Sequence, residues 1–220
     1  MTRGRRRGAT APRPARFGRA SGAALASRIA IALAVLALAA AGPGRAEEEQ
    51  RFLTVEQAPG SVFPDADAFE RRDVPLTPEL RTAIEKRLGS TRPSLWEASY
   101  ATFTARRGGT AIGYAVVVEE IGKHRPITSI VGVRPDGHVQ DVAVMVYREA
   151  YGGEVRERRF LDQYPGRAPG EPLAGRIRNV AGATLSVEAL NRSVQKGIAV
   201  VEAVYLHPEA PVPLGASATP

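Results

Sequence analysis

The chain of 220 residues contains no cysteine. Disulfide bonds, thiolate catalysis, iron–sulfur clusters and covalent haem attachment are therefore excluded within it, because each needs a cysteine sulfur. The three histidines are not spaced like metal ligands, and no acidic cluster resembles a metal site. The glycine-rich fingerprints of dinucleotide- and nucleotide-binding folds are absent too. Any redox chemistry of this chain must therefore use an organic cofactor.

Residues 1–46 contain nine arginines but no lysine and no acidic residue. Residues 29–41 then form a run of 13 without a polar side chain, and Gly44 and Ala46 supply small side chains after it. This order is typical of a secretory signal peptide. The run is shorter than the roughly 20 apolar residues of a membrane span, so cleavage is our preferred interpretation and a retained N-terminal membrane anchor is the alternative. In both cases the positive-inside rule predicts an extracytoplasmic, periplasmic location for the rest of the chain.

The net charge of +7 arises from this leader. Without its nine arginines, 21 basic residues remain against 23 acidic ones, a net charge of about −2. A protein that binds nucleic acid needs a basic surface to neutralise phosphates. We therefore predict no nucleic-acid partner.

After residue 46, the sequence predicts a short helix, four strands and a final helix. Alternating and β-branched residues predict strands over residues 97–105, 111–120, 127–133 and 139–147. Thr77, Pro78 and Gly89 predict the cap, first residue and end of a short helix before them. An amphipathic helix is predicted from Val187 to Tyr205. With no βαβ repeat, the fold class is α+β, a small antiparallel sheet with flanking helices and a C-terminal helix.

A turn of small residues, Val180-Ala181-Gly182-Ala183-Thr184-Leu185-Ser186, opens the last helix. The backbone N–H groups at a helix start attract phosphate. Gly182 and Ala183 leave space for a bulky group, and Thr184 supplies a hydroxyl. On local sequence alone, an N-cap role explains Thr184; a phosphate esterified to it is the alternative.

This turn resembles the flavinylation motif of the FMN-binding domain family, which includes the FMN-carrying subunits of Rnf and sodium-pumping NADH:quinone oxidoreductase complexes. Three further parts of the chain resemble the family in the same order. They are the first strand at 113–117, a glycine-containing hairpin at 127–137, and the segment before the flavin site at 147–153 and 160–164. The resemblance implies that Thr184 carries FMN through a phosphoester bond. It also implies a dedicated flavin transferase that installs FMN from FAD with magnesium.

The resemblance implies flavin contacts from two segments. They are the attachment turn, with Gly182, Ala183, Thr184, Leu185 and Ser186, and the loop formed by Glu149, Ala150, Tyr151 and Gly152. The alternative for the loop is a bulged strand end in which glycine serves only the backbone. For Tyr151 the alternatives are stacking on the flavin ring and an ordinary surface position. Lys123 and His124 are expected to be ordinary turn residues, with contact to phosphate or the flavin edge as the alternative.

Two positions depart from the family pattern. Arg178 stands six residues before Thr184, where the family usually has Asp, and Ala181 precedes the glycine, where the family usually has Ser or Thr. Neither change removes the acceptor hydroxyl or the helix start.

The expected organisation has four parts: a signal peptide or membrane anchor at 1–46, a helical N-terminal extension at 47–95, the FMN-binding domain at 96–207, and a disordered tail at 208–220. The function implied is an exported electron carrier with covalent FMN on Thr184, serving membrane or periplasmic redox partners. An extracytoplasmic flavin-dependent reductase and a flavin-free interaction domain of the same fold are the alternatives. No nucleophile–base pair or paired carboxylates stand out, which favours the carrier over an enzyme.

Overall fold

The computed structural model describes residues 49–208. The predicted leader at 1–46, and the predicted tail beyond residue 208, lie outside the described residues. Within residues 49–208, no helix is both long enough and apolar enough to cross a bilayer.

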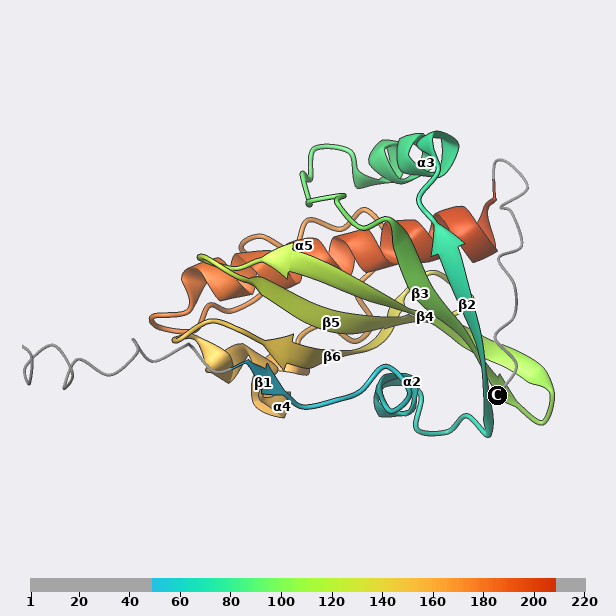
Figure 1. The fold of residues 1–220 in the computed structure, drawn as a ribbon, viewed down its shortest axis with the longest axis horizontal. Helices are drawn as coiled ribbons and strands as arrows, with labels where there is room; N and C mark the ends of the chain where they lie inside the picture. The colour runs from blue at the N-terminus through green and yellow to red at the C-terminus, as the bar shows by residue number, and fades with distance from the viewer. Residues whose placement is uncertain (1–48, 209–220) are drawn as a thin grey trace, which may run out of the picture. The chain divides into compact units, whose positions relative to one another are not determined.

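A six-stranded antiparallel sheet forms the centre of the fold, in the order β1-β6-β5-β4-β3-β2 (Figure 1). Its curled sheet and flanking helices confirm the predicted α+β class, and the strands predicted between residues 97 and 147 are all present. The strands are β1 (Gln50–Arg51), β2 (Ala68–Pro75), β3 (Ser99–Arg107), β4 (Thr110–Ile121), β5 (Pro126–Val133) and β6 (Val139–Tyr147).

Helices lie on both faces of the sheet (Figure 1). The long last helix, which the amphipathic pattern predicted, is present and continues into a π-helical turn. The helical elements are α2 (Ala58–Val62), α3 (Pro78–Leu88), the 3-10 turn η1 (Gly153–Arg156), α4 (Arg158–Leu161), α5 (Thr184–Val201) and the π-helical turn η2 (Glu202–Leu206).

Helix α3 begins and ends as predicted. The Thr77 hydroxyl accepts a hydrogen bond from the backbone N–H of Leu80, and Pro78 is the first helical residue. Gly89 ends the helix with a φ of 58°, a backbone conformation that residues with a Cβ rarely adopt.

The segment 47–95, expected as a helical extension, also contains β1 and β2, which are the two outer strands of the sheet. Strand β2 pairs along its whole length with β3. Only Val74 of β2 is buried, because an edge strand leaves most side chains in water. The alternation of apolar and polar residues that would mark β2 in the sequence is therefore missing.

Helix α5 packs closely across β4 and β5. A methyl group on Gly197 of α5 would lie 2.6 Å from the Cβ atom of Val131 on β5, so only glycine allows this separation. Apolar side chains from both elements fill the interface, among them Val116, Val118, Ile127, Val131, Val187, Leu190, Val194 and Ile198. On the opposite face, α2 covers a smaller cluster that includes Val62, Phe63, Phe103, Ile130 and Met145.

A buried charge fixes α5 along its axis. The Lys196 side chain is completely buried, and its ammonium lies 2.7 Å from Glu97 Oε1 and 3.0 Å from Glu120 Oε1. It also donates to the backbone carbonyls of Ser94 and Glu119. A buried ion pair tolerates little displacement, because a misplaced charge would be left without compensation. Lys196 therefore ties α5 to β4 and to the segment before β3.

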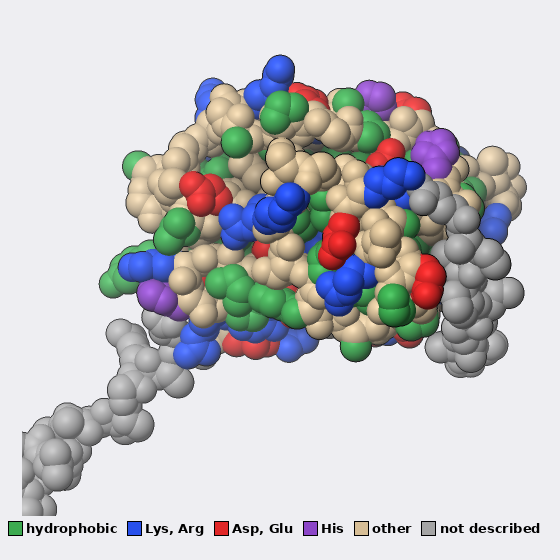
Figure 2. Space-filling model, turned by 90° about the horizontal axis from the view of Figure 1, so that it is seen from above, with side chains coloured by type: hydrophobic (Ala, Val, Ile, Leu, Met, Phe, Trp, Pro, Cys, Tyr) green, Lys and Arg blue, Asp and Glu red, His purple; other side chains and the backbone are tan. Residues whose placement is uncertain are grey.

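The surface carries charges of both signs. On the face shown in Figure 2, Lys and Arg side chains are interspersed with Asp and Glu. Exposed charges of opposite sign form ion pairs, such as Arg71 with Asp73 and Arg106 with Glu70.

The packing of α5 makes a direct prediction. Gly197→Ala should lower the free energy of unfolding by about 1–3 kcal/mol, because the added methyl forces the helix and sheet apart. Gly60→Ala in α2 is the matched control, since its methyl would meet no atom within 4 Å. Chemical denaturation of both variants checks this; equal stabilities would contradict the close approach of α5.

Candidate functional site

A pocket of about 430 Å³ lies where α5 begins, between the β4–β5 turn and the loop that follows β6. This volume is within the range of ligand sites, about 300–1,000 Å³. All the predicted flavin contacts except Gly152 line it. Its lining is formed by Lys123, His124, Glu149, Ala150, Tyr151, Gly182, Ala183, Thr184, Leu185 and Ser186.

Thr184 is exposed at this pocket and is the first residue of α5. The N-cap is Ala183, not Thr184, so the capping role suggested by local sequence is wrong. No side chain caps the helix. The Thr184 hydroxyl and the first backbone N–H groups of α5 are therefore both available to a ligand.

Asn179 orients the Thr184 hydroxyl. Its amide nitrogen donates to Thr184 Oγ1 over 3.1 Å, and its amide oxygen accepts from the backbone N–H of Val180. Sequence reasoning missed this residue. The available signal was an Asn in a turn, where its side chain commonly bonds the neighbouring backbone.

A buried tyrosine joins the loop after β6 to the start of α5. The Tyr147 hydroxyl donates to the backbone carbonyl of Tyr151, so it accepts from the Ser186 hydroxyl, 2.9 Å away. Burial raises the pKa of Tyr147, although the bond to Ser186 opposes this. Ser186 is thus fixed as a structural partner of Tyr147 at the inner side of the pocket.

Gly152 lies next to the hydrogen bond between the Tyr147 and Ser186 hydroxyls. Its φ is +86°, and an added Cβ would lie 2.9 Å from both Ser186 Oγ and the Tyr147 hydroxyl. The backbone conformation and the crowding both require glycine here. Gly152 therefore shapes the loop but does not line the pocket. Gly182, with φ of +80°, has no atom within 4 Å of such a Cβ and opens directly into the pocket.

Glu149 holds the β4–β5 turn. Its carboxylate accepts the backbone N–H groups of His124 (2.6 Å) and Arg125 (3.0 Å). Burial acts to raise the pKa of Glu149, but the backbone N–H groups of the turn outweigh it and hold the pKa below its usual value. The carboxylate is therefore charged at neutral pH and occupied by the turn.

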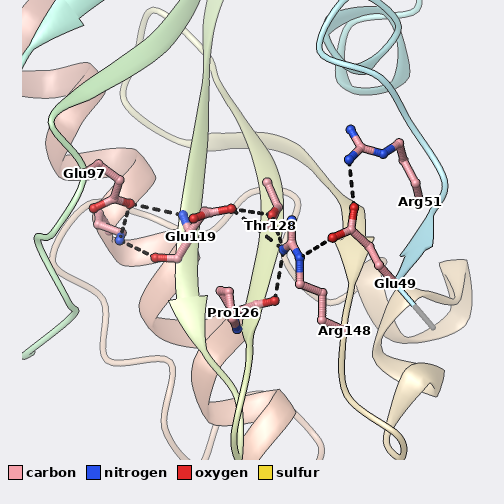
Figure 3. Close-up of polar contacts among 8 residues, drawn as sticks. Glu49, Arg51, Glu97, Glu119, Pro126, Thr128 and Arg148 are labelled. Carbon is pink, nitrogen blue, oxygen red and sulfur yellow. Dashed lines mark hydrogen bonds and ion pairs between the residues drawn. The ribbon is translucent and has the colours of Figure 1, made fainter. Parts of the chain in front are cut away.

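Arg148, the residue before Glu149, holds the start of β5, the strand that follows the β4–β5 turn. Arg148 donates to the Pro126 carbonyl and to Thr128 Oγ1, and its guanidinium also bonds Glu49 (Figure 3). Thr128 in turn donates to Glu119 on β4. Two consecutive residues after β6 thus fix residues 124–128.

The rim of the pocket is partly apolar and exposed. The side chain of Tyr151 is 85% exposed and that of Leu185 is 45% exposed. Arg178 and Ala181, the two departures from the family pattern, are exposed and lie outside the pocket lining. The backbone N–H of Arg178 donates to Gln163, which anchors the segment before the attachment turn.

The fold and the pocket define an α+β domain with a candidate ligand site at the N-terminus of its last helix. Residues 122–199 match the family model of the FMN-binding domain. Every residue of the pocket lining lies within the match. The match agrees with the resemblance to this family that the sequence motifs indicated.

Comparison with solved structures finds the crystal structure of Shewanella oneidensis NqrC. It is 15% identical, and the alignment covers 64% of this chain and 83% of that chain with a TM-score of 0.44. No curated protein matches this chain.

The lining residues fit FMN chemically. A helix start without a side-chain cap suits a phosphate group. Leu185 and Tyr151 supply apolar surface for a flat ring, and Lys123 supplies a cation. Within residues 49–208, no group of three or more His, Cys, Asp or Glu residues is arranged to hold a metal ion.

The shape of the loop after β6 predicts the effect of a substitution. Gly152→Ala should lower the free energy of unfolding by about 1–2 kcal/mol from backbone strain alone, with crowding against Ser186 adding to it. Gly153→Ala is the control, because its methyl would approach Tyr147 no closer than 3.8 Å. Thermal unfolding of both variants checks this; an unchanged melting temperature for Gly152→Ala would contradict the described loop.

The lowered pKa of Glu149 predicts the pH dependence of the turn. A carboxyl group with a depressed folded pKa contributes its full stabilisation above its usual pKa of 4.5 and loses it as the pH falls through the folded value. The NMR amide resonances of His124 and Arg125 should therefore titrate with a midpoint below pH 4.5. Glu149→Gln should abolish this titration. A midpoint above pH 4.5 in the parent protein would contradict the Glu149 clamp, by which we mean the hydrogen bonds from the His124 and Arg125 N–H groups to the Glu149 carboxylate.

Proposed function

We propose that the chain is an exported electron-transfer protein in which Thr184 Oγ1 carries FMN through a phosphoester bond. The observation that carries this proposal is the Thr184 hydroxyl. It is exposed at an uncapped helix start, oriented by Asn179, at a pocket inside an FMN-binding domain. A hydroxyl used for capping would instead be occupied by backbone N–H groups.

The attachment reaction requires FAD and a flavin transferase, in keeping with the family resemblance. Thr184 Oγ1 attacks the phosphorus of the FMN half of FAD and forms a new O–P bond. The bond between that phosphorus and the bridging oxygen breaks, and AMP leaves. The hydroxyl proton would pass to a base of the transferase or to water, and the magnesium that the resemblance implies would offset the charge of the pyrophosphate. No oxidant or reductant is consumed.

FMN, when bound, supplies reversible one- and two-electron chemistry. The chain's own residues hold the group and set its surroundings. Helix α5 presents Thr184 and its N–H groups, and the loop with Tyr151 and the turn with Lys123 enclose the pocket. A covalent link suits an extracytoplasmic carrier, because a dissociated cofactor would be lost there by diffusion. The donors and acceptors we propose are membrane or periplasmic redox proteins.

The proposed location rests on the leader. Its arginines, its apolar run and its small-residue exit support export, either with cleavage near residue 46 or with a retained anchor. Arg178 and Ala181 do not line the pocket, so neither departure changes a lining residue of the proposed flavin site.

The test is the intact mass of the full chain, exported from cells that produce an active flavin transferase. The parent protein should gain the mass of one FMN less one water. Thr184→Val, which keeps the size and loses the hydroxyl, should gain nothing, while Thr184→Ser should still be modified.

The same spectra report where the leader is removed. Circular dichroism verifies that Thr184→Val is folded, so that loss of flavin is not loss of structure. An exported, folded parent protein without added mass would contradict the proposed function and favour a flavin-free interaction domain.

A further inference from the structure

We infer that Lys123 is the cationic wall of the flavin site and that Glu149 is the positioning residue that keeps it there. The inference rests on the proposed function, because it concerns the flavin held at Thr184. It assigns a role to the β4–β5 turn, residues 122–125, which the attachment motif does not include.

The turn and the start of α5 line the same pocket. Lys123 and His124 line the same pocket as Gly182 and Thr184. A hydrogen bond from the Gly122 N–H to the Arg125 carbonyl closes the turn. The side chains of its central residues therefore project from a tight, defined loop.

The Glu149 carboxylate is built into this turn. It accepts backbone N–H groups from His124 and Arg125, and a Cβ on Gly122 would lie only 2.7 Å from Glu149 Oε1. Lys123, His124 and Arg125 are themselves exposed. An exposed turn without such contacts is mobile, so the carboxylate is what gives Lys123 a fixed position.

The charges favour an anion in the pocket. Within residues 49–208, the Lys123 ammonium has no ion-pair or hydrogen-bond partner. The nearby carboxylate of Glu149 is occupied by backbone N–H groups, which offset its charge. Reduction adds negative charge to a flavin, and a fixed cation at the pocket wall stabilises that charge. Lys123 therefore raises the midpoint potential of the bound flavin.

The first test is redox titration of the loaded, exported protein. Lys123→Gln should shift the ratio of reduced to oxidised flavin at a fixed potential about tenfold toward the oxidised form, the effect of a nearby, partly screened charge. Lys86→Gln on α3, also an exposed Lys, is the matched control and should leave the ratio unchanged. No shift for Lys123→Gln would overturn the inference.

The second test asks whether Glu149 positions Lys123. Glu149→Ala removes the acceptor of the turn, so Lys123→Gln should have little effect in that background. Glu149→Gln keeps an oxygen that accepts both N–H groups, so the effect of Lys123→Gln should return. An equal effect of Lys123→Gln in the parent and in Glu149→Ala would show that Glu149 has no positioning role.

The third test needs no flavin. In unloaded Thr184→Val protein, the amide hydrogens of His124 and Arg125 should exchange faster after Glu149→Ala, while those of α5 stay protected. Unchanged exchange would overturn the clamp. The two proposals fail separately, because loading is read from the intact mass. If the loaded protein keeps the same midpoint potential after Lys123→Gln, only this inference is contradicted. An exported parent protein without flavin would contradict both proposals.

Discussion

The close packing of α5 on the sheet is the constraint on which the site depends. Gly197 lets the helix approach Val131, and the buried Lys196 ammonium fixes the helix along its axis. Both contacts lie more than two turns from Thr184, but an α-helix is stiff over this length. The place where α5 begins, and so the place of the Thr184 hydroxyl, therefore follows from packing in the core.

The pocket itself is made by segments that are distant in the chain and joined by polar contacts. Glu149 ties the β4–β5 turn to the end of β6, and Tyr147 ties the following loop to Ser186. Asn179, which precedes the attachment turn, donates a hydrogen bond to the Thr184 hydroxyl. Such contacts fix the geometry of a cofactor site more reliably than exposed loops alone. The contacts of Glu149 and Tyr147 shape the pocket, and the contact of Asn179 orients the Thr184 hydroxyl, the acceptor of the flavin phosphate.

The sequence was sufficient for the elements with a strong local pattern. The periodic apolar residues of α5, the β-branched strands up to Tyr147 and the capped helix α3 were predicted and are present. Strand β2 was not, because an edge strand needs no buried face. The clamp by Glu149 was not predictable either, since its partners are backbone N–H groups, which any residue supplies. The same reason hides Asn179: a side chain that bonds its neighbours leaves no spacing pattern. The motif resemblance pointed to most of the pocket lining, but Lys123 and His124, expected as ordinary turn residues, also line the pocket. Only the structure could show which side chains support it.

The most direct test of the account is peptide mapping of protein matured in its native host. Trypsin should release residues 179–192 as one peptide, because arginines precede and end it. If Thr184 carries the flavin, this peptide is fluorescent and its fragmentation places the flavin phosphate on Thr184. A flavin recovered on another peptide, or this peptide recovered only unmodified, would contradict the central claim.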